Sequence, residues 1–247
     1  APGGIFKAIK FVYGNLHALD TESIRAEQEL QALERVKNIR HPFILTIERV
    51  EEIDGELIIV MELADKDLHD VLVECRTRGQ VGIDRNELLQ YLRDAAEALD
   101  LMHRQHGLQH LDIKPSNLFL VSNRVKVADF GLVKALEGRT GISSTNGLMG
   151  GVTPVYAAPE TFQGKISQSS DQYSLAIVYQ ELLTGGLPFK GRNAQQLMFQ
   201  HTQTDPDLES LPVTDRPVVA RALAKDPAKR FPSCIDFIRA LIQATPG

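Results

Sequence analysis

Residues 110–117 read HLDIKPSN, and this octapeptide decides how the rest of the chain is interpreted. It places a carboxylate (Asp112), an ammonium (Lys114) and an amide (Asn117) within six positions. These three groups suit a phosphoryl transfer, in which the carboxylate accepts a proton from an incoming hydroxyl, the ammonium contacts the phosphate and the amide oxygen binds Mg²⁺. A solvated loop would explain a His and an Asp alone, but not the Lys, Pro and Asn that follow. Residues 110–117 are therefore the candidate catalytic loop.

A second tripeptide, Asp129-Phe130-Gly131, follows a short predicted hairpin that turns at Ser122-Asn123. The hairpin folds the chain back, so Asn117 and Asp129 are expected on the same side. An amide oxygen and a carboxylate make a site for a hard cation, which substrate phosphates would complete. Gly131 gives the backbone freedom just after the metal ligand.

Composition limits the alternatives. The chain has 247 residues, 43% of them hydrophobic, and a net charge of −5. It can form one large domain or two small lobes, and its acidic balance argues against nucleic-acid binding. No apolar run approaches the roughly 18 residues of a membrane span. Cys75 and Cys234 are expected to be free thiols in a reducing compartment, so we expect this domain in the cytoplasm, whatever anchors a parent protein. The chain opens with APGG and no Met, so we expect it to be a piece of a longer protein.

The hydrophobic pattern changes character along the chain. Strands are predicted over residues 6–12, 44–52 and 56–62, and a helix over 21–37. Beyond Ala64 the chain is mostly helical, beginning with a long amphipathic segment over 87–106. The pattern predicts an α+β fold with two lobes, residues 1–64 and 65–247.

Four further motifs accompany the catalytic loop and the Asp129 tripeptide. They are Ala8-Ile9-Lys10, GVTPVYAAPE over residues 151–160, DQYSLA over 171–176 and KDPAKRF over 225–231. With these six motifs in order, the chain from Phe6 to about Leu241 resembles a eukaryotic-like protein kinase catalytic domain of the bacterial serine/threonine type. The resemblance implies a two-lobed fold with a small antiparallel-sheet N-lobe, here truncated, and a larger helical C-lobe. It also implies transfer of the γ-phosphate of ATP to Ser or Thr hydroxyls of protein substrates.

The resemblance implies a nucleotide site. Lys10 would hold the α- and β-phosphates of ATP and pair with Glu29, or alternatively with Glu27. Met61 would be the gatekeeper, and Glu62 to Ala64 would present backbone groups to adenine.

The resemblance also assigns the remaining polar residues. Asp65 or Asp67 would reach the ribose, Asp112 would be the base and Lys114 would contact the phosphate. Together with Thr153, Lys114 favours Ser or Thr acceptors over Tyr. The implied ligands of Mg²⁺ or Mn²⁺ are Asn117 and Asp129. The implied structural and regulatory positions are Leu111, Phe130, Gly131, Thr153, Glu160, Asp171 and Arg230, of which Glu160 would pair with a basic residue of KDPAKRF.

Two departures from the family pattern affect regulation and nucleotide binding. Leu111 replaces an Arg that couples the loop to a phosphorylated activation loop. We therefore expect a working enzyme that depends little on phosphorylation of its candidate sites, which are Thr140, Ser143, Ser144 and Thr145. The family's glycine-rich phosphate lid should precede Lys10 by about twenty residues. Gly3 and Gly4 fit a turn better than this lid, so the chain as it stands is expected to bind nucleotide poorly and to leave a sheet edge exposed.

Other classes explain the sequence less well. A pseudokinase scaffold has the same fold, but Lys10, Asp112, Asn117 and Asp129 are all intact. A P-loop NTPase is excluded because GxxxxGK[ST] is absent. The spacing of His103, His106 and His110 straddles a helix end and a loop, which argues against a zinc site. A pure interaction module would not explain four polar residues in transfer positions.

Overall fold

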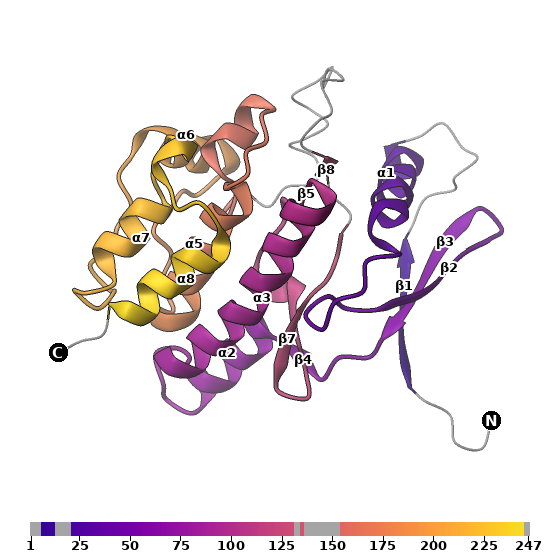
Figure 1. Ribbon diagram of the computed structural model, residues 1–247, viewed down its shortest axis with the longest axis horizontal. Coiled ribbons are helices and arrows are strands. Elements are labelled where there is room, and N and C mark those ends of the chain that lie inside the picture. Colours follow the sequence, from indigo (N-terminus) through magenta and orange to yellow (C-terminus); the bar gives the residue numbers. More distant parts are fainter. Residues whose placement is uncertain (1–5, 13–20, 131–133, 136–153, 245–247) are drawn as a thin grey trace.

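The computed structural model describes residues 6–12, 21–130, 134–135 and 154–244 (Figure 1). Within these ranges a small antiparallel sheet with one helix forms the N-lobe, and a mostly helical C-lobe follows. The predicted α+β, two-lobed fold class is therefore confirmed. Gly131, Thr153 and the four candidate phosphorylation sites lie outside the described residues.

The N-lobe sheet consists of β1 (Lys7–Val12), β2 (Ile47–Ile53) and β3 (Glu56–Glu62), in the order β1-β3-β2. Asp54 and Gly55 both have positive φ, 53° and 84°, as the two-residue turn between β2 and β3 requires. Helix α1 (Thr21–Val36) covers this sheet through Ala26 and Leu33, which cluster with Leu57 and Ile59. In the described part of the chain, β1 pairs with β3 alone, and Phe6, Ile9 and Phe11 beside that edge are exposed.

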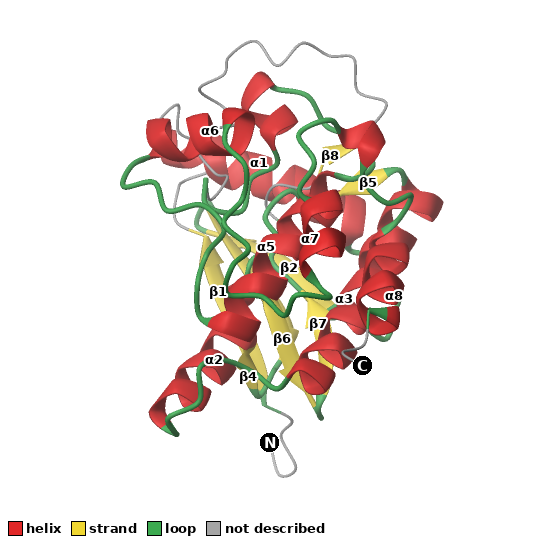
Figure 2. Cartoon of the chain, turned by 90° about the vertical axis from the view of Figure 1, so that its left-hand side faces the viewer, coloured by secondary structure: helices red, strands yellow, loops and turns green. Residues whose placement is uncertain are grey.

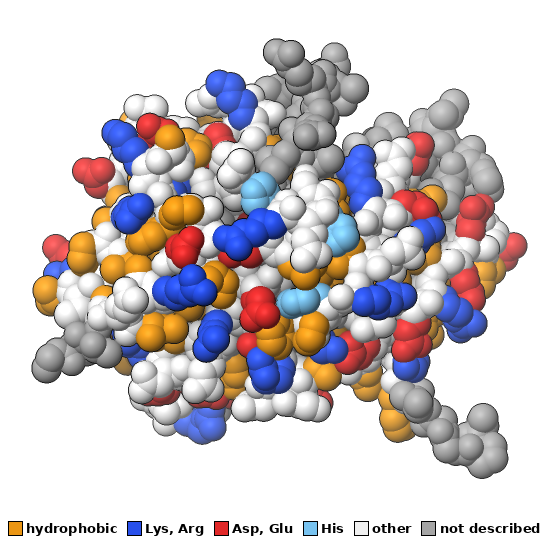
Figure 3. All heavy atoms as spheres, in the orientation of Figure 1, with side chains coloured by type: hydrophobic (Ala, Val, Ile, Leu, Met, Phe, Trp, Pro, Cys, Tyr) orange, Lys and Arg blue, Asp and Glu red, His pale blue; other side chains and the backbone are white. Residues whose placement is uncertain are grey.

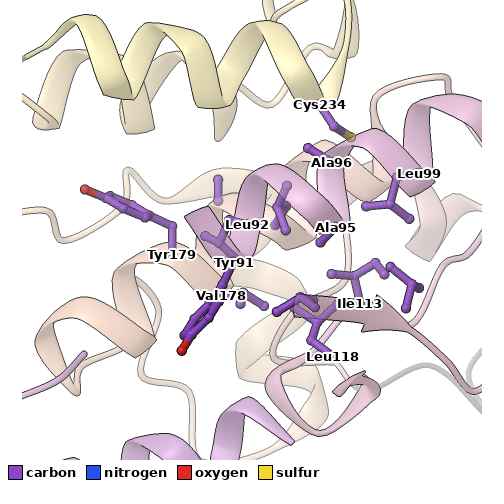
Figure 4. Close-up of a cluster of buried hydrophobic side chains, with 14 of the residues drawn as sticks. Tyr91, Leu92, Ala95, Ala96, Leu99, Ile113, Leu118, Val178, Tyr179 and Cys234 are labelled. Atoms are coloured by element: carbon purple, nitrogen blue, oxygen red, sulfur yellow. The ribbon is translucent and has the colours of Figure 1, made fainter. Parts of the chain in front are cut away.

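The C-lobe is built around α5 (Ser170–Thr184), which is buried along nearly its whole length. The long helix α3 (Arg85–His106) packs against it, and Figure 4 shows Leu92 and Ala95 of α3 in one buried cluster with Val178 of α5. The other C-lobe α-helices within the described ranges are α2 (Leu68–Thr77), α6 (Ala194–Gln203), α7 (Arg216–Ala222) and α8 (Cys234–Gln243). Short 3₁₀ helices cover Pro115–Asn117, Pro159–Gln163 and Pro227–Lys229.

A second small sheet carries the predicted catalytic segment. Its strands are β4 (Lys66–Asp67), β6 (Leu118–Val121) and β7 (Arg124–Val127), in the order β4-β6-β7. Nearby, β5 (Leu108–Gln109) pairs with β8 (Lys134–Ala135). Figure 2 shows β1, β6 and β7 in the centre of the view, with α3 and α8 on one side.

Most predicted elements agree with the structure, and their deviations have local causes. The strand predicted from residue 44 begins at Ile47, because the chain around Ile44 pairs instead with β7: Leu45 N–H donates to Val127 O, and Val127 N–H donates to Phe43 O. Helix α3 begins two residues earlier than predicted, because the Asp84 side chain accepts hydrogen bonds from the backbone of residues 86 and 87. None of the helices in the described ranges has both the length and the apolar character of a membrane span.

Candidate active site

The backbone of the catalytic loop is fixed by one buried carboxylate. Asp171, at the start of α5, accepts hydrogen bonds from the backbone N–H of His110 and of Leu111, both at 2.8 Å. Burial raises the pKa of Asp171, although the charge of His110 and these two N–H groups oppose the shift. Leu111 has a φ of 67°, which a side chain with a Cβ rarely adopts. The loop is therefore held in a strained conformation by contacts from outside it.

Asp112, Lys114 and Asn117 are gathered around one carboxylate oxygen. Lys114 Nζ lies 2.7 Å from Asp112 Oδ2, and Asn117 Nδ2 donates to the same oxygen at 3.1 Å. Asn117 Nδ2 also donates to the backbone oxygen of Asp112 at 2.8 Å. The carboxylate that sequence analysis assigns as the base is thus oriented by both of its predicted companions.

The hairpin brings Asn117 next to Asp129, as its turn residues predict. The backbone N–H of Ala128 donates to Asn117 O at 3.0 Å, and strand β6 begins at Leu118, directly after Asn117. Asp129 has a φ of 62°, and the ring of Phe130 packs against His110 with centroids 5.3 Å apart. Asn117 Nδ2 is engaged by Asp112, so the amide oxygen of Asn117 and the carboxylate of Asp129 are the candidate hard donors for Mg²⁺. Among the described residues, no group of three or more His, Cys, Asp or Glu side chains could hold a metal ion.

Lys10 lies between two carboxylates from distant parts of the chain. Its Nζ is 2.6 Å from Glu29 Oε1 on α1 and 2.9 Å from Asp129 Oδ1. Burial by itself lowers the pKa of Lys10, but the charges and hydrogen bonds of these two acids outweigh it and raise that pKa. Burial raises the pKa of Asp129, yet the Lys10 ammonium more than offsets this and leaves it below its ordinary value. Of the two glutamates that the sequence left open, Glu29 makes the ion pair, whereas Glu27 accepts a bond from Gln31 Nε2.

A small cavity of about 30 Å³ adjoins this ion pair and is lined by Lys10, Met61 and Phe130, among others. A groove of about 490 Å³ lies elsewhere, between α3 and α8, with Arg93, Arg104 and Ile242 in its lining. Figure 3 shows Lys, Arg, Asp and Glu side chains mixed over the face that carries these helices. Because the smaller cavity is the one lined by Lys10, Glu29 and Asp129, size does not identify the candidate active site.

The acidic residues after Met61 have partners of their own. Both oxygens of Glu62 lie 2.8 Å from Lys126 Nζ; burial raises the pKa of Glu62, but the bond to Lys126 outweighs it and lowers that pKa. Asp65 Oδ2 accepts from the backbone N–H of Ser122 at 3.0 Å. Asp67 caps α2 through the backbone N–H of Asp70. The ribose contact of Asp65 therefore stays a prediction, and Asp67 has a structural role that its sequence position did not reveal.

A buried ion pair anchors the segment that follows residue 153. Arg230 Nη1 and Nη2 lie 2.9 and 2.8 Å from the two oxygens of Glu160, and both side chains are buried. Ser167 and Ser170 hydroxyls donate to Glu160 Oε1, both at 2.8 Å. The KDPAKRF motif predicts the ion pair but not these hydroxyl donors, because serines in a loop give no sequence signal of their partner.

The fold and this constellation define a phosphotransferase domain. Residues 3–247 match the family of the protein kinase domain, and the chain belongs to that family. It is similar to serine/threonine-protein kinase PknF of Mycobacterium tuberculosis (strain ATCC 25618 / H37Rv), at 33% identity over 95% of this chain and 50% of that protein. It is also 31% identical to serine/threonine-protein kinase PknB of Mycobacterium leprae (strain TN), over 97% of this chain and 39% of that protein. The probable serine/threonine-protein kinase PknB of Lactococcus lactis subsp. lactis (strain IL1403) is 32% identical over 91% of this chain and 35% of its own length.

The family match and these similarities identify the chain as a protein kinase catalytic domain of the bacterial serine/threonine type. The chain spans half or less of the length of each of the three.

Proposed function

We propose that this domain transfers the γ-phosphate of Mg-ATP to Ser or Thr hydroxyls of protein substrates. The observation that carries the proposal is the position of Lys10, whose ammonium joins Glu29 of α1 to Asp129 after the hairpin. A kinase needs this ion pair and the Asp that binds the metal to be in place together before it can transfer phosphate. The arrangement therefore supports an active catalyst more than a scaffold.

The nucleotide would lie between the proposed lobes, residues 1–64 and 65–247. Lys10 would hold the α- and β-phosphates, Met61 would stand behind the adenine, and the backbone from Glu62 to Ala64 would bind its edge. Asp65 would turn to the ribose only by releasing the backbone N–H of Ser122. Two buried free thiols, Cys75 and Cys234, fit a cytoplasmic domain with access to ATP.

The catalytic residues would divide the reaction among them. Asp112 accepts the proton of the acceptor hydroxyl, and Lys114 balances charge on the transferring phosphate. Asn117 and Asp129 would hold Mg²⁺ through their side-chain oxygens, and Mn²⁺ suits the same donors. When bound, the metal ion neutralises charge on the phosphates.

We further propose that activity depends little on activation-loop phosphorylation. Leu111 cannot donate hydrogen bonds to a phosphate, whereas the Arg of the family pattern can. The Asp171 carboxylate binds the loop backbone at this position without any phosphate. Replacing Thr140, Ser143, Ser144 and Thr145 together by Ala should leave most activity, and a several-hundredfold loss would refute this regulation.

Transfer of labelled γ-phosphate from Mg-ATP to the protein itself and to a generic basic protein tests the function. The full-length protein should be active, and Asp112→Asn should abolish transfer. Asp207→Asn, at an exposed surface aspartate, serves as the matched control. If the wild-type protein binds ATP but transfers no more than Asp112→Asn, the domain acts as a pseudokinase-like scaffold instead.

A further inference from the structure

The strained position in the catalytic loop depends on how Asp171 is oriented. Asp171 Oδ1 accepts from the N–H of Leu111, and Oδ2 accepts from the N–H of His110. A carboxylate that rotated about its own side-chain bonds could not satisfy both N–H groups at once. Leu111, with its φ of 67°, would then be free to relax toward a more ordinary backbone conformation. Asp112 follows directly in the chain, so the base would move with it.

Gln109 is a buried amide placed beside this carboxylate. It lies in β5 with only 1% of its surface exposed. The amide orientation that satisfies both side-chain atoms directs Nε2 to Asp171 Oδ2 at 3.1 Å and to Ser167 O at 3.3 Å. In the same orientation Oε1 accepts from His103 Nδ1 at 3.1 Å. Burying an amide is unfavourable unless it is hydrogen-bonded, and here partners from three separate segments bind it.

Four hydrogen bonds form a chain from α3 to the loop. His103 on α3 fixes the amide oxygen of Gln109, which fixes the direction of its nitrogen. That nitrogen donates to Asp171 Oδ2 and so holds the carboxylate in its orientation. The carboxylate in turn accepts from the backbone N–H groups of His110 and Leu111. Linked hydrogen bonds in a dry interior support one another, so the loss of one weakens the others.

We propose that Gln109 is a positioning residue for phosphate transfer, which acts through Asp171 to hold Leu111 left-handed and Asp112 in place. This inference rests on the proposed kinase function. Among the described residues, the hydrogen-bond partners of Gln109 include neither the proposed nucleotide-binding residues nor the carboxylate of Asp112. Its loss should therefore lower kcat and leave the KM for ATP nearly unchanged.

Two substitutions at residue 109 separate hydrogen bonding from packing. Gln109→Met keeps the length of the side chain and removes its hydrogen bonds. Gln109→Glu keeps the shape, removes the donor and sets a second carboxylate against Asp171. Each should lower kcat about tenfold, because small displacements of a catalytic group cost one to two orders of magnitude. Gln105→Met, at an exposed glutamine near the end of α3, is the matched control and should match wild type.

A partner substitution tests whether the effect passes through the strained residue. In a Leu111→Gly background the left-handed conformation carries no side-chain strain, so it needs less support. Gln109→Met should then cost kcat about threefold or less, because residues coupled in one network are not additive. At His103, Asn should retain the donor that Nδ1 supplies and preserve more kcat than Leu does. Thermal melting of each variant identifies any loss of kcat that comes from unfolding.

Hydrogen–deuterium exchange over residues 108–113 gives a readout that needs no activity. The proposal is supported if Gln109→Met lowers kcat, accelerates exchange in this segment, and loses most of its effect in the Leu111→Gly background. It is overturned if kcat and exchange are unchanged, or if the loss of kcat is the same in both backgrounds. A wild-type protein without transfer activity would overturn the proposed function, and the positioning role would then stand or fall by the exchange data alone.

Discussion

Breaking the buried ion pair between Glu160 and Arg230 should cost more unfolding free energy than breaking one of the domain's exposed ion pairs. Arg230 is fully buried and donates to both oxygens of Glu160, and also to the backbone oxygens of Ser169 and Ala224. Arg230→Met leaves a buried carboxylate without its cation. Removal of one partner from a buried pair costs about 3–5 kcal/mol, and the hydroxyls of Ser167 and Ser170 keep this case near the lower limit. For a domain of this size, about 3 kcal/mol corresponds to a fall in Tm of about 6–12 °C.

The pH dependence of that loss tests its electrostatic origin. Burial raises the pKa of Glu160, but the hydrogen bonds and charge of Arg230 outweigh it and hold that pKa below its ordinary value. The stabilisation is therefore fully present above the unfolded-state pKa of roughly 4.3 and is lost as pH falls through the folded-state pKa. In Arg230→Met the uncompensated carboxyl gains protons more readily, so the difference in unfolding free energy between the two proteins should shrink on acidification.

Thermal and urea unfolding at pH 7 and near pH 4 measure both effects. Arg239→Met, which removes an exposed ion pair to Asp236, should cost less than about 1 kcal/mol. Adding Glu160→Gln to Arg230→Met should recover part of the loss, because it removes the buried charge. The reasoning is refuted if Arg230→Met costs no more than the surface control, or if its cost does not change with pH.

Three further changes test the site and its surroundings. Asp112→Asn should lower kcat at least about a hundredfold at unchanged Tm, and kinetics with melting curves would contradict the role of this base if kcat stayed within tenfold. Glu29→Gln removes one of the two carboxylates that hold Lys10, so it should raise the KM for ATP and lower kcat, and an unchanged steady-state profile would argue against the ion pair. Burial lowers the pKa of His201 to about 4, so the neutral folded state should lose stability as pH falls from about 6.5 toward 4. Unfolding of His201→Gln should lack that component, and an identical pH profile would contradict it.

The features that the sequence predicted well are those fixed by local geometry. Ser122-Asn123 dictates a two-residue turn, with φ of 50° and 64°, and the turn sets the register of the hairpin. That register places Asn117 opposite Ala128, the residue before Asp129, so the placement of the two candidate metal ligands followed from short-range rules. The Asp54-Gly55 turn in the N-lobe was predictable for the same reason.

The choice between Glu27 and Glu29 depended on packing that short-range rules do not contain. Glu29 and Leu33 are four residues apart and therefore share one face of α1. Leu33 is buried against the sheet, and this burial directs Glu29 to Lys10 on β1. From the sequence alone, either Glu27 or Glu29 could lie on the helix face that points to the sheet. The surface that the helix covers decides which one does.

The hydrogen-bond partners of Gln109, Asp65 and Asp67 could not be predicted from the sequence. The sequence offers Asp65 or Asp67 as the ribose contact, which stays a prediction, and it gives no sign that Asp65 accepts from a turn N–H across a sheet or that Asp67 caps a helix. Gln109 has its partners on α3 and α5, at positions 103 and 171, which no periodicity connects. Polar residues whose partners are distant in sequence carry no local signal, although they often determine the geometry of a site.

Leu111 connects these observations to regulation. An Arg at this position would form charge-assisted hydrogen bonds to a phosphate in a solvent-exposed loop. That interaction weakens as salt is added and is lost when the phosphate is removed. The contacts that hold Leu111 here are backbone N–H groups bound to a buried carboxylate, which salt screens little. Under the proposed regulation the catalytic loop would be set when the chain folds, because the contacts that hold it come from the core. Control of such a kinase would then act on substrate or nucleotide access, and less on the loop itself.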